Sequence, residues 1–160
     1  MKVEITDINT NHLKELHKWE LDAELQIKTG VDVPRTYEQF NKSYMAYFNG
    51  EKPNLLLKAI QLDGRLIGKV ELYRTKKRDY IGIVIAQKRN HGVGTEALNL
   101  FLLYISEELG VDTIFAEVYE DNGGSLRFFA KNGFLATGER TEEWFRGKPR
   151  TLVTLKKELN

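Results

Sequence analysis

The sequence has 160 residues, which is long enough for one domain with a sizeable core. Hydrophobic residues make up 41% and charged residues 29%, the balance of an ordinary soluble globular protein. The formal net charge of +1, from 24 basic and 23 acidic residues, argues against a dedicated nucleic-acid binder, and the absence of cysteine excludes a disulfide framework, a thiolate nucleophile and a zinc ribbon.

Other features of the composition indicate a cytoplasmic protein with one domain over residues 1–160. The three histidines are too few and too scattered to suggest a metal site. No apolar run approaches the roughly 18 residues of a membrane helix. The first residues alternate between apolar and polar side chains and do not resemble a signal peptide. We therefore expect neither a bound metal nor a membrane partner.

The first predicted elements are a strand and a helix. Residues 2–8 alternate as a strand does. Asn11 is placed to cap a helix in which Leu13, Leu16 and Trp19 recur at turn spacing, although the sequence does not mark the end of this helix.

A second helix is predicted after a loop that contains Gly30 and Pro34. Thr36 and Gln39 have the spacing of a capping box, in which each side chain accepts from the backbone N–H of the other residue. Gly50 is expected to end this helix. One face of it carries four aromatic residues, which are Tyr37, Phe40, Tyr44 and Tyr47.

Three strands are predicted next. Residues 55–62 and 66–73 are joined by Asp63-Gly64, which is a strong signal for a β-hairpin. The charged run 76–79 makes another turn, and residues 80–86 form the third strand.

The longest predicted helix covers roughly residues 93–109, and Gly110 is expected to end it. A buried strand follows at residues 113–119. The residues expected on the inward face of the helix are Ala97, Leu98, Phe101, Leu102, Ile105 and Leu109.

The last predicted elements are a short helix and a strand pair. The helix begins at Asn122 or Gly123 and stops at Gly133, and the antiparallel strands are residues 134–141 and 151–157. The resulting order, βααβββαβαββ, predicts a mixed, three-layer α/β/α domain.

A glycine-rich turn at residues 87–95, Gln-Lys-Arg-Asn-His-Gly-Val-Gly-Thr, lies between a predicted strand and the longest helix. At such a helix start, free backbone N–H groups and the helix dipole favour a phosphate. In Arg89-x-x-Gly92-x-Gly94, the two glycines let the backbone approach a bulky anion closely. This turn is therefore a candidate pyrophosphate site, the alternative being a tight turn with close helix packing.

A second motif lies about 30 residues later, at Asn122-Gly-Gly-Ser125-Leu-Arg-Phe-Phe129-Ala-Lys131-Asn-Gly133-Phe. Together with the glycine turn and the element order, it resembles the GNAT superfamily of acetyl-CoA-dependent N-acetyltransferases, whose pattern is Asn-x-x-Ala/Ser, an aromatic residue, then Lys-x-Gly-Phe. The resemblance covers about residues 3–158. The tail, residues 138–150, is similar to the branch that contains ribosomal-protein N-terminal and spermidine acetyltransferases.

The resemblance implies that acetyl-CoA is the cosubstrate and that an amine is acetylated directly, without a covalent enzyme intermediate. A strand would bind the pantetheine arm through its main chain, and the glycine turn would bind the pyrophosphate. Asn122 could equally be a plain helix cap, and Lys131 a solvated cation at a helix end. The cofactor-binding residues implied are Ile83, Val84, Ile85, Arg89, Asn90, His91, Gly92, Val93, Gly94, Thr95, Asn122, Ser125 and Lys131.

Two glutamates are candidates for the base that takes the amine proton. Glu117 lies on the strand that runs into Asn122, where some family members carry a glutamate, and Glu71 lies in the middle of a strand that should be central. The alternative for both is an ordinary surface or ion-paired glutamate, and a neutral amine could also react without a dedicated base.

The expected acid departs from the family pattern. Many relatives carry a tyrosine where this sequence has Phe129, and phenylalanine has no proton to donate to the departing thiolate. Tyr119, Ser125 or water are substitutes. The departure also leaves open a second function, a catalytically weak or inactive CoA-binding sensor. A dinucleotide-binding oxidoreductase is poorly supported, because the one glycine turn follows antiparallel strands.

The expected partners are acetyl-CoA and an amine acceptor, with a homodimer left open. The acceptor should bind opposite the cofactor, between the first helices and the last hairpin, and protein α-amines, polyamines and aminosugars are the candidates. Acidic side chains in these segments could attract a cationic amine, or could simply be solvated. They are Glu20, Asp22, Glu24, Glu38, Glu139, Glu142 and Glu143.

Overall fold

Seven strands form one mixed sheet within residues 2–87 and 92–160, which are those that this computed structural model describes. The order across the sheet is β1-β2-β3-β4-β5-β7-β6, and every neighbouring pair is antiparallel except β4 with β5. The strands are β1 (Val3–Asp7), β2 (Leu55–Leu62), β3 (Arg65–Arg74), β4 (Asp79–Ile85), β5 (Thr113–Tyr119), β6 (Leu135–Phe145) and β7 (Lys148–Glu158). The predicted mixed α/β class is confirmed.

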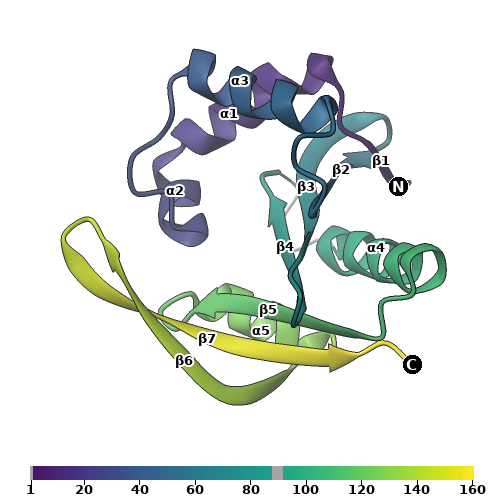
Figure 1. The fold of residues 1–160 in the computed structure, drawn as a ribbon, viewed down its shortest axis with the longest axis vertical. Helices are drawn as coiled ribbons and strands as arrows, with labels where there is room; N and C mark the ends of the chain where they lie inside the picture. Colours follow the sequence, from purple (N-terminus) through teal and green to yellow (C-terminus); the bar gives the residue numbers. More distant parts are fainter. Residues whose placement is uncertain (1, 88–91) are drawn as a thin grey trace.

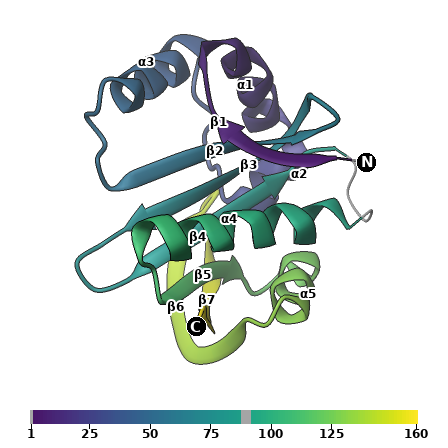
Figure 2. The same cartoon turned by 90° about the vertical axis from the view of Figure 1, so that its right-hand side faces the viewer.

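Helices cover both faces of this sheet (Figure 1), with α1 to α3 on one face and α4 and α5 on the other, as Figure 2 shows. Each face has its own buried core, built around Phe101 on the α4 side and Phe40 on the α3 side. No helix of the described ranges is long and apolar enough to cross a bilayer. The helices are η1 (Thr10–His12), α1 (Leu13–Leu21), α2 (Ala23–Thr29), α3 (Tyr37–Phe48), α4 (Val93–Leu109) and α5 (Gly123–Lys131).

Several local signals act as the sequence predicts. The Thr36 hydroxyl accepts from Gln39 N at 3.2 Å and the Gln39 side chain accepts from Thr36 N at 3.0 Å, which completes the capping box of α3. Asp63 and Gly64 have φ values of 51° and 80°, as a tight hairpin turn requires. Gly110 adopts a left-handed conformation and ends α4.

The predicted cap of the first helix is wrong. Asn9, not Asn11, accepts through its side chain, from Asn11 N at 2.9 Å, and it opens a turn of 3-10 helix before α1 begins at Leu13. His12 completes this arrangement, because its Nδ1 accepts from Asn9 N at 3.1 Å.

A further helix, α2, follows α1, in the segment where the sequence does not mark the end of the first helix. The Asp22 side chain caps it by accepting from Leu25 N at 3.0 Å, and Gly30 ends it with φ +75°. Its seven residues bury Leu25 and Gln26 only, so they carry no apolar periodicity.

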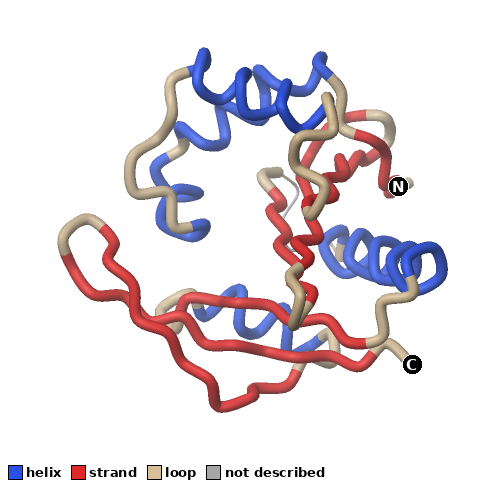
Figure 3. Tube along the Cα trace, in the orientation of Figure 1, coloured by secondary structure: helices blue, strands red, loops and turns tan. Residues whose placement is uncertain are grey.

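Two further expectations need correction. Leu109 is 36% exposed, because it is the last residue of α4 and extends beyond the core. The final strands are longer than predicted and meet at Arg146-Gly147, whose φ values of 52° and 78° form a tight turn. Figure 3 shows the tip of this long hairpin near α2.

Candidate active site

The strands β4 and β5 meet at one end and diverge at the other (Figure 1). Among the described residues, the one registered pair between them is Tyr80 with Phe115. The remainder of β4, up to Ile85, is therefore paired with β3 on one side and open on the other. This opening exposes main-chain donors and acceptors at the centre of the sheet.

The direction of one hydrogen bond shows which residues of β4 face this opening. Ala86 N donates to Ile67 O of β3 at 2.8 Å. Because alternate residues direct their main-chain groups to opposite neighbours, Val84 also faces β3, and Ile83 and Ile85 face the opening. Ile83 and Ile85 are thus placed to offer main-chain groups to a pantetheine arm, as expected. Val84 is not, and it contributes its side chain to the cavity lining instead.

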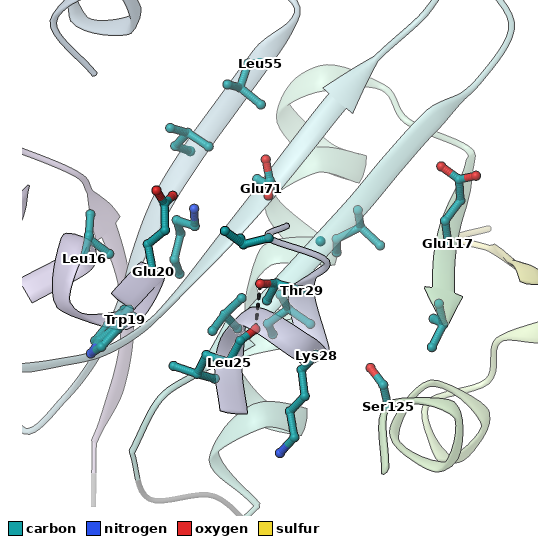
Figure 4. Close-up of a pocket in the computed structure, with 18 of the residues that line it drawn as sticks. Leu16, Trp19, Glu20, Leu25, Lys28, Thr29, Leu55, Glu71, Glu117 and Ser125 are labelled. Atoms are coloured by element: carbon teal, nitrogen blue, oxygen red, sulfur yellow. Dashed lines mark hydrogen bonds between the residues drawn. The ribbon is translucent and has the colours of Figure 1, made fainter. Parts of the chain in front are cut away.

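A cavity of about 590 Å³ lies beside the opening, between α1 to α3 and the sheet. Both candidate bases line it, and Figure 4 shows Glu71 and Glu117 on two strands, which are β3 and β5 with β4 between them in the sheet. Asn122 and Phe129 also line it. The structure therefore brings the two predicted carboxylates and part of the second motif to one cavity.

Strand register places the two carboxylates in one row. Glu71 lies opposite Gly82, and extending the parallel pair Tyr80–Phe115 by two residues sets Gly82 beside Glu117. Two strand spacings amount to roughly 10 Å, and because β4 and β5 diverge beyond Tyr80 and Phe115, the two glutamates lie on strands at least that far apart. Gly82 lies between them without a side chain, and a Cβ there would lie 3.2 Å from Glu71 Oε1. The Glu71 side chain thus lies over Gly82, on the side of β4 that faces Glu117.

The start of α4 directs backbone donors out of the helix. Its N-cap residue, Gly92, has φ +75° and no side chain with which to cap them. The first intrahelical bond runs from Glu96 N to Gly92 O at 3.1 Å, so the N–H groups of Val93, Gly94 and Thr95 precede the helical ladder.

The two glycines of this turn have different structural roles. A Cβ on Gly92 would meet nothing within 4 Å, whereas a Cβ on Gly94 would lie 3.0 Å from Cε1 of Phe128. Gly92 therefore supplies the left-handed backbone and Gly94 the close approach of α5. The predicted contacts of Arg89, Asn90 and His91 lie outside the described residues.

The second motif divides between the cavity and the surface. The Asn122 side chain caps α5 by accepting from Ser125 N at 3.2 Å, and both residues line the cavity. Capping and ligand binding can therefore coexist at Asn122. Lys131 lies exposed in the last turn of α5, away from the cavity lining.

Neither Phe129 nor Tyr119, which both line the cavity, is suited to donate a proton. Phe129 is buried, with its ring edge-on to those of Phe128 and Phe134. The Tyr119 hydroxyl donates to Glu143, and burial together with this hydrogen bond raises the pKa of Tyr119 well above its ordinary value. Tyr119 is consequently a poorer acid than a free tyrosine.

A tight contact joins the end of α2 to this tyrosine. A Cβ on Gly30 would overlap the Tyr119 hydroxyl, which Glu143 holds in place, and the Arg150 guanidinium lies 3.6 Å from the ring centroid. The hairpin tip is joined to the same region, because Arg146 N donates to Asp32 Oδ1 at 2.9 Å.

We expect Gly30→Ala to lower the free energy of unfolding more than Gly50→Ala does. Both glycines have positive φ, but a Cβ on Gly50 meets nothing within 4 Å. The left-handed backbone alone should cost about 1–2 kcal/mol, and the clash with Tyr119 should add about 1–3 kcal/mol. Urea unfolding of both variants measures the difference, and equal losses would contradict the contact.

The charges around the cavity differ from those expected. Of the seven acidic residues proposed as its walls, Glu20 alone lines it, and the Arg35 guanidinium binds Glu20 at 2.6 Å. Burial opposes ionisation of Glu20, but hydrogen bonds from Arg35 outweigh it and lower the pKa of Glu20. Others are held elsewhere, such as Glu139 by Arg78.

Sequence reasoning missed the lysine nearest the candidate bases. Lys69 lines the cavity two residues before Glu71, on the same face of β3. Burial lowers the pKa of Lys69, but attraction to Tyr44 and Glu71 outweighs this and raises it. The strand alternation that placed Glu71 toward the acceptor also applied to Lys69, so the signal was present in the sequence.

The chain matches the acetyltransferase (GNAT) domain over residues 2–135. An N-acetyltransferase 9-like protein of Caenorhabditis briggsae is 24% identical over 133 residues, which are 75% of this chain and 67% of that protein.

Two solved structures share the fold. A spermidine N-acetyltransferase from Vibrio cholerae, in complex with CoA and spermine, has a TM-score of 0.86 at 16% identity and covers 98% of this chain and 95% of its own. An acetyl transferase from Salmonella typhimurium, which modifies the N-terminal serine of ribosomal protein L7/L12, has a TM-score of 0.84 at 14% identity. The match covers 100% of this chain and 96% of the Salmonella chain.

Proposed function

The chain belongs to the GNAT family of acetyltransferases, and from that premise we propose that it transfers the acetyl group of acetyl-CoA to a primary amine. The observation that carries this proposal is the row of Glu71, Gly82 and Glu117 beside the open edge of β4. Two proteins of similar structure are a spermidine N-acetyltransferase and an acetyl transferase that modifies a protein N-terminal serine. A polyamine, an aminosugar and a protein α-amine are accordingly candidate acceptors.

The residues present fit a phosphate-bearing thioester. The uncapped start of α4 offers the N–H groups of Val93, Gly94 and Thr95 to a pyrophosphate. The open main-chain groups of Ile83 and Ile85 suit an extended pantetheine arm, which would add to β4 as a strand does. Arg89, Asn90 and His91, between these elements, remain proposed phosphate contacts.

Bound acetyl-CoA supplies an activated acetyl group as a thioester. The amine nitrogen attacks the carbonyl carbon, a C–N bond forms, the C–S bond breaks, and one proton leaves the nitrogen. Glu117 or Glu71 accepts that proton. A main-chain N–H of β4 facing the opening stabilises the developing oxyanion.

The thiolate of CoA must leave or gain a proton. Tyr119 is engaged by Glu143, and Phe129 has no proton to give. The Ser125 hydroxyl lines the cavity, and we assign it or a water molecule to this step. A second candidate function rests on the same observation, since a chain without an acid could bind CoA as a sensor without turnover.

Release of free thiol from acetyl-CoA tests the two functions against each other. The purified chain is incubated with acetyl-CoA and a panel of primary amines that includes spermidine, glucosamine, amino acids and short peptides. Amine-dependent thiol release supports the transferase. CoA binding by calorimetry without thiol release for any amine would favour the sensor.

A further inference from the structure

The polar side chains of the cavity are unevenly distributed. Glu71 and Glu117 lie at the opening between β4 and β5, where the amine is proposed to react. The cationic groups lie on two walls of the cavity. One wall is made by α2, α3 and the segments next to them, and the other is made by β3. The cations that line the cavity are Lys28, Arg35, Lys52 and Lys69, and the anions are Glu20, Glu71 and Glu117.

Most of these cations are engaged away from the opening. Arg35 binds Glu20 at 2.6 Å, and Lys28 binds Glu24 at 2.8 Å. Lys52 donates to the Ser43 hydroxyl at 2.5 Å. Lys69 is thus the cation whose place next to the reacting groups needs an explanation.

The surroundings of Lys69 supply no cross-strand acid. Its partners in register are Ala59 on β2 and Val84 on β4, both apolar. Within residues 2–87 and 92–160, no carboxylate forms an ion pair with its ammonium; the Tyr44 hydroxyl is its hydrogen-bond partner, Glu71 attracts it and Arg35 repels it. The Lys69 side chain is half-buried, so an anion that joins its ammonium would offset part of the cost of removing that charge from water.

Lys69 and Glu71 present a cation and a carboxylate at adjacent positions on one face of β3. Lys69 and Glu71 are two residues apart on one face of β3, so their Cα atoms lie about 6.6–6.8 Å apart. A ligand amine beside Glu71 and a ligand anion beside Lys69 would both be paired. A polyamine, which carries only positive charges, would instead place cations against Lys69.

We propose that the acceptor is a small primary amine that carries a carboxylate-like anion close to its nitrogen, as an α-amino acid does, and that Lys69 binds this anion. The inference rests on the proposed acetyl transfer and specifies its substrate class. Tyr44, which is buried on α3, donates its hydroxyl to the same anion. The alternative is that Lys69 serves only to neutralise Glu71.

The experiment compares amino acids with the amines that remain when their carboxylate is removed. Methionine is paired with 3-(methylthio)propylamine and phenylalanine with phenethylamine, and spermidine and a neutral tripeptide are added. We expect kcat/KM to be about 10- to 100-fold higher for one or more amino acids than for the matched amine, as expected for a charge-assisted hydrogen bond.

A variant then assigns the preference to Lys69. Lys69→Met keeps the length of the side chain, removes its charge, and should abolish the preference by lowering kcat/KM for the amino acid alone. Lys28→Met is the matched control, because Lys28 lines the same cavity but is paired with Glu24. It should leave the preference intact.

The outcomes separate this inference from the proposed function. Turnover of spermidine or of the decarboxylated amines at rates equal to or above those of the amino acids would overturn the inference and leave the transferase standing. A preference that survives in Lys69→Met would overturn the role of Lys69. If no amine of the panel raised thiol release above the rate without amine, both the inference and the proposed transferase would be overturned.

Discussion

Replacing Glu117 by Gln should lower kcat for acetylation by about 10²–10⁴-fold, the loss expected when a general base is removed. Glu117 lines the cavity at the opening of the sheet and is also exposed, so it can pass the amine proton on to solvent. Gln keeps the shape of the side chain but cannot accept this proton. The measurement is steady-state thiol release, with CoA affinity followed by calorimetry and expected to stay within about twofold.

Glu71→Gln is the matched comparison, because Glu71 lies in the same row across Gly82. We expect it to raise KM for the amine more than it lowers kcat, since a carboxylate that only holds the cation contributes equally to the ground and transition states. The reverse pattern, a full-rate Glu117 variant and a slow Glu71 variant, would transfer the base role to Glu71. Full rates in both would mean that the amine reacts without a dedicated base.

Local chemistry made most of the fold predictable. Asp63-Gly64 and Thr36-x-x-Gln39 act through neighbouring backbone groups, so a few residues suffice to fix the turn or cap. The helix α2 has a cap at Asp22 and a stop at Gly30 but no apolar periodicity, because its burial depends on contacts with distant segments, such as the bond from Arg146 Nη2 to Gln26 Oε1 at 2.8 Å. The sequence between α1 and α3 therefore resembles a loop.

The candidate site was predictable only where one element determined it. Alternation placed Glu71 on one face of its strand, and the motif placed Asn122 at a helix start. The row that joins Glu71 to Glu117 depends on the register of three strands, which no local pattern encodes. The prediction of an acidic cavity wall failed for the same reason. Ion pairs such as that of Glu20 with Arg35 form only when distant segments meet.

Replacing Ile83 by Pro should lower kcat for acetylation by about 10²–10³-fold, the cost of losing one oxyanion donor. Ile83 lines the cavity, and its main-chain groups face the opening and not β3. Proline removes the N–H while the β3–β4 ladder stays complete, because a proline is tolerated where its N–H side is unpaired. Circular dichroism and thermal unfolding check that the sheet persists.

Ile83→Ala is the control that separates the donor from the side chain. It shortens the side chain as proline does but keeps the N–H, so it should retain most of the rate. Val84→Pro probes the opposite side of β4, where the N–H is expected to bond to β3, and should destabilise the fold instead. If the Ile83→Pro and Ile83→Ala variants were equally active, no oxyanion donor could lie at this position, and the main chain at Ile85 would be the next to test.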